Sequence, residues 1–268
     1  MKQLFLVCVW AIVFGCATER PSSHSFSDQF GVQEITRDTY VVRDRFYHDS
    51  NILVARMPDD TVLIASSPFE TQGADLLISW IQDSFHPKAL VAINPHFHSD
   101  GTAGNPSYLA AGAQVWAGDK TLALQKQKAE SYRSIEARDF EDRPELKARI
   151  LKRKIALANH EFRTEDGKTF NLGGERVEVI YPGPAHTLDN VVVYLPARKV
   201  LFGGCMIRPK SSLGPTADAD ISAWPASAKR LEDLKAEYVI AGHAVVGGPE
   251  LIERTVETAQ KANLNPVP

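Results

Sequence analysis

Two histidines and an aspartate stand close together in the motif His96-x-His98-x-Asp100, where an apolar segment gives way to polar residues. Neutral imidazole nitrogens and carboxylate oxygens are ligands that zinc accepts, so this spacing could hold a metal ion. Paired histidines also occur by chance on exposed loops, and this motif alone leaves a metal site and an ordinary loop equally open. The decision depends on the rest of the chain.

Three further residues of suitable type lie in the second half of the chain: His186, Cys205 and His243. Each follows an apolar segment of strand character, and if those strands are neighbours, their ends converge on one edge of the fold. Taken singly, each histidine could be an ordinary loop residue, and Cys205 a small buried apolar one. Together the six residues indicate a metal site with mixed histidine, aspartate and cysteine ligands.

The cysteines also bear on this site. Cys8 and Cys16 lie in the N-terminal segment, so Cys205 is the one thiol left in a processed chain and no internal disulfide is expected. A free thiol in an oxidising compartment is a liability unless it is buried or bound to metal. We therefore expect Cys205 to be either buried or bound to metal.

The N-terminal segment predicts export. Residues 1–16 carry Lys2, an apolar run and Gly15-Cys16, the order of a secretory signal, although a buried N-terminal helix is the alternative. Val13-Phe14-Gly15-Cys16 also resembles a bacterial lipoprotein cleavage box. Lipidation of Cys16 would anchor the protein to a membrane face, whereas cleavage just beyond it would release the protein into the periplasm. Residues 17–30 are expected to form a tether.

Apolar segments of strand and helix character alternate along the rest of the chain. In the first half, strands are predicted at 40–42, 51–57, 61–65, 89–94 and 114–117, and helices at 71–85 and 106–111. In the second half, strands are predicted at 170–172, 176–181, 190–195, 200–202 and 238–241, and helices at 224–234 and 249–262. We expect residues 31–268 to form one α+β domain, a four-layer αββα sandwich that buries the apolar faces. The strand order is not predicted.

A long charged segment, 120–158, has helical composition, and Pro144 is expected to divide it into two helices. We treat residues 119–161 as a helical insertion. Its sparse apolar residues favour a surface excursion over a substrate lid, and both alternatives stay open.

Composition excludes some classes of function. The 268 residues are 44% hydrophobic and 24% charged, as in a globular protein, with a formal net charge of −3. No basic stripe is present, so nucleic acid is not an expected partner.

The six candidate ligands, in their order along the chain and with Gly203-Gly204-Cys205 ahead of Ala223-Trp224-Pro225, resemble the ligand set of the subclass B1 metallo-β-lactamases. The resemblance runs from about Val41 to the C-terminal helix. Within the subclass, Ser67-Pro68-Phe69-Glu70 and the helical insertion are most similar to the São Paulo branch.

The resemblance implies an exported, monomeric hydrolase that opens penicillins, cephalosporins and carbapenems with two zinc ions per chain. His96, His98 and His186 would hold the first zinc, and Asp100, Cys205 and His243 the second. Asp100 would also orient the attacking hydroxide. Arg208, three residues after Cys205, stands where relatives commonly have a lysine that pairs with the substrate carboxylate, and a solvated or structural arginine is the alternative.

Some positions depart from the subclass pattern. Pro215 stands near an asparagine that helps many relatives bind the lactam carbonyl, so that role is not transferred. Ser66 replaces an aspartate found beneath the ligands of many relatives, which predicts weaker support for the metal. Pro95, directly before His96, could shift that ligand.

Three alternatives remain. A thioester hydrolase or lactonase of the same fold usually has histidine directly after the motif aspartate and aspartate as the later ligand, whereas Gly101 and Cys205 stand here. A catalytically silent zinc-binding lipoprotein would need a missing ligand, yet all six are present. A mononuclear enzyme with asparagine at the first histidine is disfavoured by His96.

Overall fold

The computed structural model describes residues 25–264. The predicted signal at 1–16, including Cys16, and most of the predicted tether lie outside these residues. The described end of the tether is folded: α1 (Phe26–Gln29) and the first residue of β1 pack against the domain, and Phe30 is 3% exposed. No helix in the described part is both long and apolar enough to cross a membrane.

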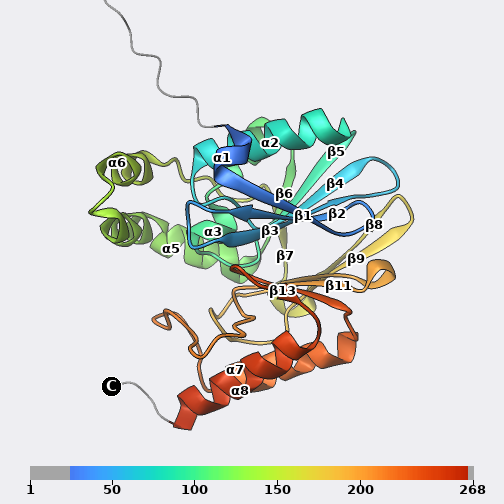
Figure 1. Cartoon of the computed structure of the whole chain (residues 1–268), viewed down its shortest axis with the longest axis vertical. Coiled ribbons are helices and arrows are strands. Elements are labelled where there is room, and N and C mark those ends of the chain that lie inside the picture. The colour runs from blue at the N-terminus through green and yellow to red at the C-terminus, as the bar shows by residue number, and fades with distance from the viewer. Residues whose placement is uncertain (1–24, 265–268) are drawn as a thin grey trace, which may run out of the picture.

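The first sheet has seven strands in sequential order (Figure 1). They are β1 (Phe30–Thr36), β2 (Thr39–Asp44), β3 (Ser50–Arg56), β4 (Thr61–Ala65), β5 (Ala89–Ile93), β6 (Gln114–Gly118) and β7 (His160–Phe162). Strands β1 to β4 pair antiparallel, and β4 to β7 pair parallel. Because parallel strands end at the same edge, the segments that follow β4 and β5 emerge side by side.

The second sheet has six strands in the order β13-β12-β11-β10-β9-β8. They are β8 (Lys168–Leu172), β9 (Glu175–Ile180), β10 (Val192–Leu195), β11 (Val200–Gly204), β12 (Tyr238–Ala241) and β13 (Val246–Gly247). The pair β11 and β12 is parallel. Residues after β11 and after β12 therefore also emerge at one edge.

Apolar side chains of the two sheets form a shared core between them. Leu53, Leu63 and Ile93 of the first sheet pack with Val193 and Phe202 of the second, and each is fully or almost fully buried. These strands read as continuous apolar runs because helices cover their other faces.

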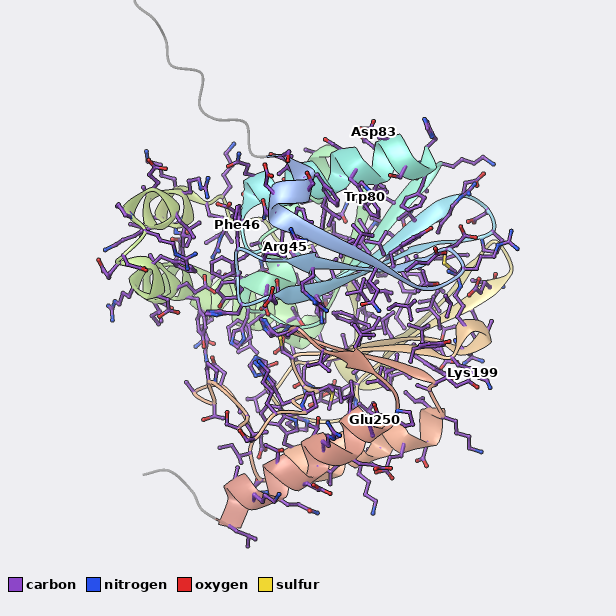
Figure 2. The ribbon with its side chains drawn as sticks, viewed as in Figure 1. Arg45, Phe46, Trp80, Asp83, Lys199 and Glu250 are labelled. Carbon is purple, nitrogen blue, oxygen red and sulfur yellow. The ribbon has the colours of Figure 1, made fainter. Side chains whose placement is uncertain are left out.

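Helices form the outer layers. On the first sheet lie α2 (Thr71–Phe85) and α4 (Asn105–Ala110), and on the second lie α7 (Trp224–Lys229), with η4 (Arg230–Leu234), and α8 (Glu250–Leu264). Trp80 of α2 packs on Tyr40 with ring centroids 6.1 Å apart. Figure 2 labels Trp80 and the exposed Asp83, both on α2. The predicted αββα sandwich is confirmed.

Several short elements were not predicted: β1, β7, β13, α1 and α3 (Ser99–Thr102). Strand β1 is largely exposed and lacks an alternating apolar pattern, and β7 and β13 have only three and two residues. Patterns this short or this polar carry little periodic signal.

The charged segment forms α5 (Asp119–Glu136), η1 (Ala137–Phe140) and α6 (Pro144–Lys152). Pro144 begins the second α-helix, where a missing N–H costs nothing. Phe140 and Ile150 pack with Phe69 in a small apolar cluster of their own, so the insertion is not merely a solvated arm.

Candidate metal centre

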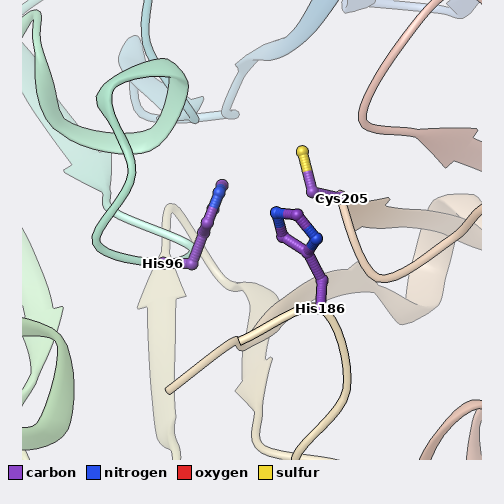
Figure 3. Close-up of side chains that lie close together, drawn as sticks. All are labelled: His96, His186 and Cys205. Carbon is purple, nitrogen blue, oxygen red and sulfur yellow. The ribbon is translucent and has the colours of Figure 1, made fainter. Parts of the chain in front are cut away.

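The six candidate ligands come from the ends of strands in both sheets. His96, His98 and Asp100 follow β5 in the first sheet, and His98 and Asp100 flank the start of α3. His186 lies in the loop between β9 and β10, Cys205 follows β11, and His243 follows β12. Figure 3 shows His96, His186 and Cys205 pointing toward one another from separate segments.

The structure brings all six side chains into one buried cluster. Asp100 lies centrally: its Oδ1 is 3.3 Å from Nε2 of His96, and its Oδ2 is 3.3 Å from Nε2 of His243 and 3.1 Å from Sγ of Cys205. Nδ1 of His98 and Nε2 of His186 lie 3.1 Å apart. The fold thus brings together residues that lie up to about 150 positions apart in the sequence, His96 and His243.

Three overlapping groups of these side chains have ligand atoms within 4.8 Å of one another. One is the predicted trio of Asp100, Cys205 and His243. The others are His96, His98 and Asp100, and His96, His186 and Cys205. The three predicted histidine ligands are also adjacent, with ring centroids 4.9 to 5.3 Å apart.

The donor atoms fit a metal ion. Nε2 of His96 is buried and makes no hydrogen bond within the described chain, although Oδ1 of Asp100 lies 3.3 Å away as its ionic neighbour. Nδ1 of His243 lies 3.0 Å from the carbonyl oxygen of His48 and Nε2 of His98 lies 3.1 Å from Asp218, so in each ring the other nitrogen is left for a ligand role. Imidazole, carboxylate and thiolate groups together suit zinc.

The cluster is also electrostatically prepared for a cation. Burial opposes a carboxylate at Asp100, but the imidazoles of His96 and His243 hold its pKa well below the usual range. Burial likewise opposes charge on His243, yet Cys205 and Asp100 raise its pKa to about 10. Burial and the neighbouring histidines hold the pKa of His186 well below its usual value, which favours the neutral, ligating form. A bound cation would balance the charge of these anionic groups, because metal binding takes the place of proton binding at such ligands.

Hydrogen bonds from neighbouring strand ends fix the loop that carries Asp100. The backbone carbonyl of Asp100 accepts from Oγ of Ser66 at 2.6 Å and from the N–H of Ser67 at 2.9 Å. Ser66 therefore supports the ligand loop through the backbone, where many relatives were expected to use a carboxylate. Gly101 is required by close packing, because a Cβ at this position would lie 2.5 Å from the carbonyl oxygen of His96.

The second-sheet ligands are fixed by equally close contacts. A Cβ on Gly242 would lie 2.6 Å from Sγ of Cys205, so this glycine makes room for the thiol. The N–H of Asn51 donates to the carbonyl of Gly242 at 2.8 Å and ties β3 of the first sheet to the His243 loop. Pro95 does not displace His96 from the cluster, and its carbonyl accepts from Val191 at 2.8 Å.

Arg208 lies near the cluster on the loop after β11. Its Nε is buried without a hydrogen-bond partner in the described residues, and its positive charge contributes to the lowered pKa of His186. Its guanidinium lies beside Gly214, a residue of the 210–220 loop with a positive φ of 72°. Arg208 is partly buried, and a guanidinium with an unpartnered N–H is suited to an anionic ligand.

Sequence reasoning missed the residues around His98. Asp218 accepts from Nε2 of His98 at 3.1 Å and from Nζ of Lys128 at 2.5 Å, and the ring of Tyr132 stacks on His98 at 4.9 Å. Asp218 is 120 positions from His98, and its type and neighbours carry no spacing signal. Only the folded structure shows that Lys128, Tyr132 and Asp218 surround His98.

Residues 48–243, which span all six ligands, match the Metallo-beta-lactamase superfamily. The chain belongs to that family. It is 28% identical to the metallo-β-lactamase type 2 of Bacteroides fragilis over 95% of this chain and 94% of the relative, and 35% identical to that of Pseudomonas aeruginosa over 78% and 73%. The solved metallo-β-lactamase of Pontibacter korlensis superposes with a TM-score of 0.72 at 26% identity, covering 87% of this chain and 99% of the other. The DIM-1 metallo-β-lactamase exposed to ceftazidime gives 0.70 at 26% identity, covering 87% and 98%. The family match, the superposed structures and the clustering of the six candidate ligands therefore point to the same fold and the same site.

Proposed function

We propose that this metallo-β-lactamase family member is a zinc-dependent β-lactamase that hydrolyses the β-lactam amide bond of penicillins, cephalosporins and carbapenems and so confers antibiotic resistance. The observation that carries the proposal is the convergence of three histidines, an aspartate, a cysteine and a further histidine from both sheets on one buried cluster. The relatives named metallo-β-lactamase type 2, matched over most of the chain, supply the reaction class.

We infer that the six residues divide between two zinc ions. His96, His98 and His186 would hold the first, and Asp100, Cys205 and His243 the second. When bound, zinc supplies Lewis acidity, which polarises a carbonyl and lowers the pKa of water. Three protein ligands for each ion leave room for substrate, as catalytic sites require.

The protein's own groups orient the reactants. The buried Asp100 carboxylate faces both ligand sets, so it is placed to orient the attacking nucleophile by hydrogen bonding. Arg208 would bind the carboxylate that β-lactams carry: its buried Nε has no hydrogen-bond partner among the described residues, and a guanidinium can contact a carboxylate in a forked geometry. Binding at this point would fix the lactam carbonyl relative to the cluster.

The test is hydrolysis of a penicillin and a carbapenem by the purified chain before chelation, after chelation and after zinc is restored. Ring opening that disappears with chelation and returns with zinc supports the proposal. A folded chain that carries two zinc ions but leaves both substrates intact would contradict it, and thioester and lactone substrates would then identify a different hydrolase of this fold. Zinc content per chain tests the stoichiometry of two.

Export, chain association and placement within the family are part of the same proposal. We propose a monomer that reaches the periplasm, with Cys16 either lipidated or removed with the signal, and a sequence nearest the São Paulo branch. Fractionation of cells that express the full chain or Cys16→Ala tests the anchor: lipidated protein sediments with membranes, and the variant does not. Sedimentation tests the monomer.

A further inference from the structure

The helical insertion reaches the metal-ligand loop at two separate places. In Figure 1, α5 lies beside α3, the short helix that starts between His98 and Asp100. One contact lies under the loop and involves Ser99. The other lies against the outer side of His98.

The contact under the loop is a buried polar triad. Oγ of Ser99 donates to Oε2 of Glu136 at 2.7 Å, and Nη2 of Arg153 donates to the same carboxylate at 2.7 Å and to Ser99 at 2.6 Å. The side chains of Arg153 and Glu136 are only 4% and 8% exposed. Arg153 also donates to the carbonyl of Phe69 at 2.8 Å, so its charge is well satisfied. Glu136 is the last residue of α5, and Arg153 directly follows α6. Both helices of the insertion therefore contribute a hydrogen bond to Ser99, which lies between the candidate ligands His98 and Asp100.

The contact beside His98 involves two residues one turn apart on α5. Nζ of Lys128 lies 2.5 Å from Oδ1 of Asp218, whose other oxygen is 3.1 Å from Nε2 of His98. The ring of Tyr132 stacks on His98 with a centroid distance of 4.9 Å and an interplanar angle of 27°. Residues four apart on a helix share a face, so one face of α5 both stacks on the imidazole and anchors its hydrogen-bond partner.

We propose that the insertion is a positioning element for the metal site: Ser99 links the ligand loop to the buried Glu136 and Arg153 pair, and Lys128 and Tyr132 orient His98. This rests on the proposed metal-dependent function. None of these insertion residues is a candidate ligand, so each acts through the loop or through Asp218. Groups that orient metal ligands typically affect metal affinity 10- to 100-fold when they are lost.

Metal affinity, rather than turnover, is the direct readout. Ser99→Ala removes the hydroxyl link and leaves the Glu136 and Arg153 pair intact, and Lys128→Met removes the anchor of Asp218. Lys126→Met, at an exposed position on the same helix, is the matched control. Zinc affinity, from competition with a chromophoric chelator, should fall about 10- to 100-fold in the first two variants and stay unchanged in the control. The absorption bands of the cobalt-loaded protein should shift in the same two variants, and Lys128→Arg should restore much of the affinity.

A double-mutant cycle isolates the route through Asp218. In the background of Asp218→Asn, Lys128→Met should have little further effect on zinc affinity, because the carboxylate that Lys128 pairs with has already been removed. A full additional loss in that background would overturn this route. If Ser99→Ala and Lys128→Met bind zinc as the control does, the insertion does not position the site. A raised KM with unchanged zinc affinity in Lys128→Met would show that Lys128 contacts substrate instead, and would also refute the inference.

These outcomes are distinct from failure of the proposed function. A wild-type chain that takes up no zinc overturns both proposals. A wild-type chain that binds zinc together with insertion variants that bind it equally well overturns only this one. A zinc-loaded wild-type chain without β-lactam turnover refutes the proposed reaction, while the affinity differences among variants still decide the role of the insertion.

Discussion

The sharpest functional prediction concerns Arg208. We expect Arg208→Met to raise the KM for a β-lactam because the substrate carboxylate loses a charged partner. The guanidinium has a buried Nε without a hydrogen-bond partner among the described residues, so its replacement breaks no hydrogen bond of that atom. Methionine keeps much of the apolar volume of the arginine stem.

The size of the effect follows from the type of contact. A hydrogen bond to a charged group contributes about 1.5–3 kcal/mol. Since about 1.4 kcal/mol is a tenfold change in an equilibrium constant, KM should rise roughly 10- to 100-fold. The effect on kcat should be smaller if this contact is made equally in the ground state and the transition state. Arg208→Lys should recover part of the loss through a single-point contact.

The assay compares a β-lactam acid with its carboxylate ester. In the wild type, esterification should raise KM about as much as Arg208→Met does for the acid, and the two changes together should add little. Lys210→Ala, at an exposed position two residues later, is the control and should leave both substrates unaffected. Equal losses on acid and ester would refute the reasoning, because the arginine would then not be recognising the carboxylate.

Three other changes test the site and the fold. Cys205→Ala should reduce bound zinc from two ions to one and abolish most turnover while far-ultraviolet circular dichroism stays unchanged, and two zinc ions with full activity would remove Cys205 from the site. Asp119 accepts from the hydroxyl and N–H of Thr164, which lower its pKa, so Asp119→Asn should cost about 1 kcal/mol in urea unfolding at neutral pH. A lowered folded-state pKa stabilises the protein above the unfolded pKa, and this is lost as pH falls through the folded value; the deficit should therefore shrink below about pH 4. Arg198 donates two hydrogen bonds to the Glu175 carboxylate, at 2.7 and 2.8 Å, at the end of β11 that lies far from Cys205. Arg198→Met should therefore lower the free energy of unfolding by about 3 kcal/mol without changing KM. An unchanged unfolding midpoint would contradict this expectation.

The clustering of the six candidate ligands could be predicted because each occupies a position that strand patterns reveal. Cys205 and His243 directly follow apolar runs, and the runs proved to be the neighbouring parallel strands β11 and β12. Apolar runs of five or so residues between turn signals are among the clearer features of a sequence. Their pairing order was not predictable, because it depends on packing between sheets.

The residues around the ligands could not be predicted for a different reason. Asp218 resembles any loop aspartate, and Lys128 any lysine on a charged helix, until the fold places them on either side of one hydrogen bond. The buried pair of Glu136 and Arg153 lies within a segment whose composition indicated a solvated surface. Charged residues are usually exposed, so a pattern of composition assigns the rare buried pair to the wrong environment.

The distribution of ligands between the sheets has a consequence for folding. His96, His98 and Asp100 belong to the first sheet, whereas His186, Cys205 and His243 belong to the second. One of the three groups, His96, His98 and Asp100, comes from a single loop, but the other two draw donors from both sheets, so the full cluster of six forms only when the two sheets pack. A metal that binds the folded state and not the separated sheets would stabilise that packing by mass action, by about 4 kcal/mol at a thousand times its Kd. The insertion contacts the loops of both sheets: Ser99 of the first-sheet loop and Asp218 of the loop after β11. It therefore bridges the two sets of candidate ligands whose association metal binding would stabilise.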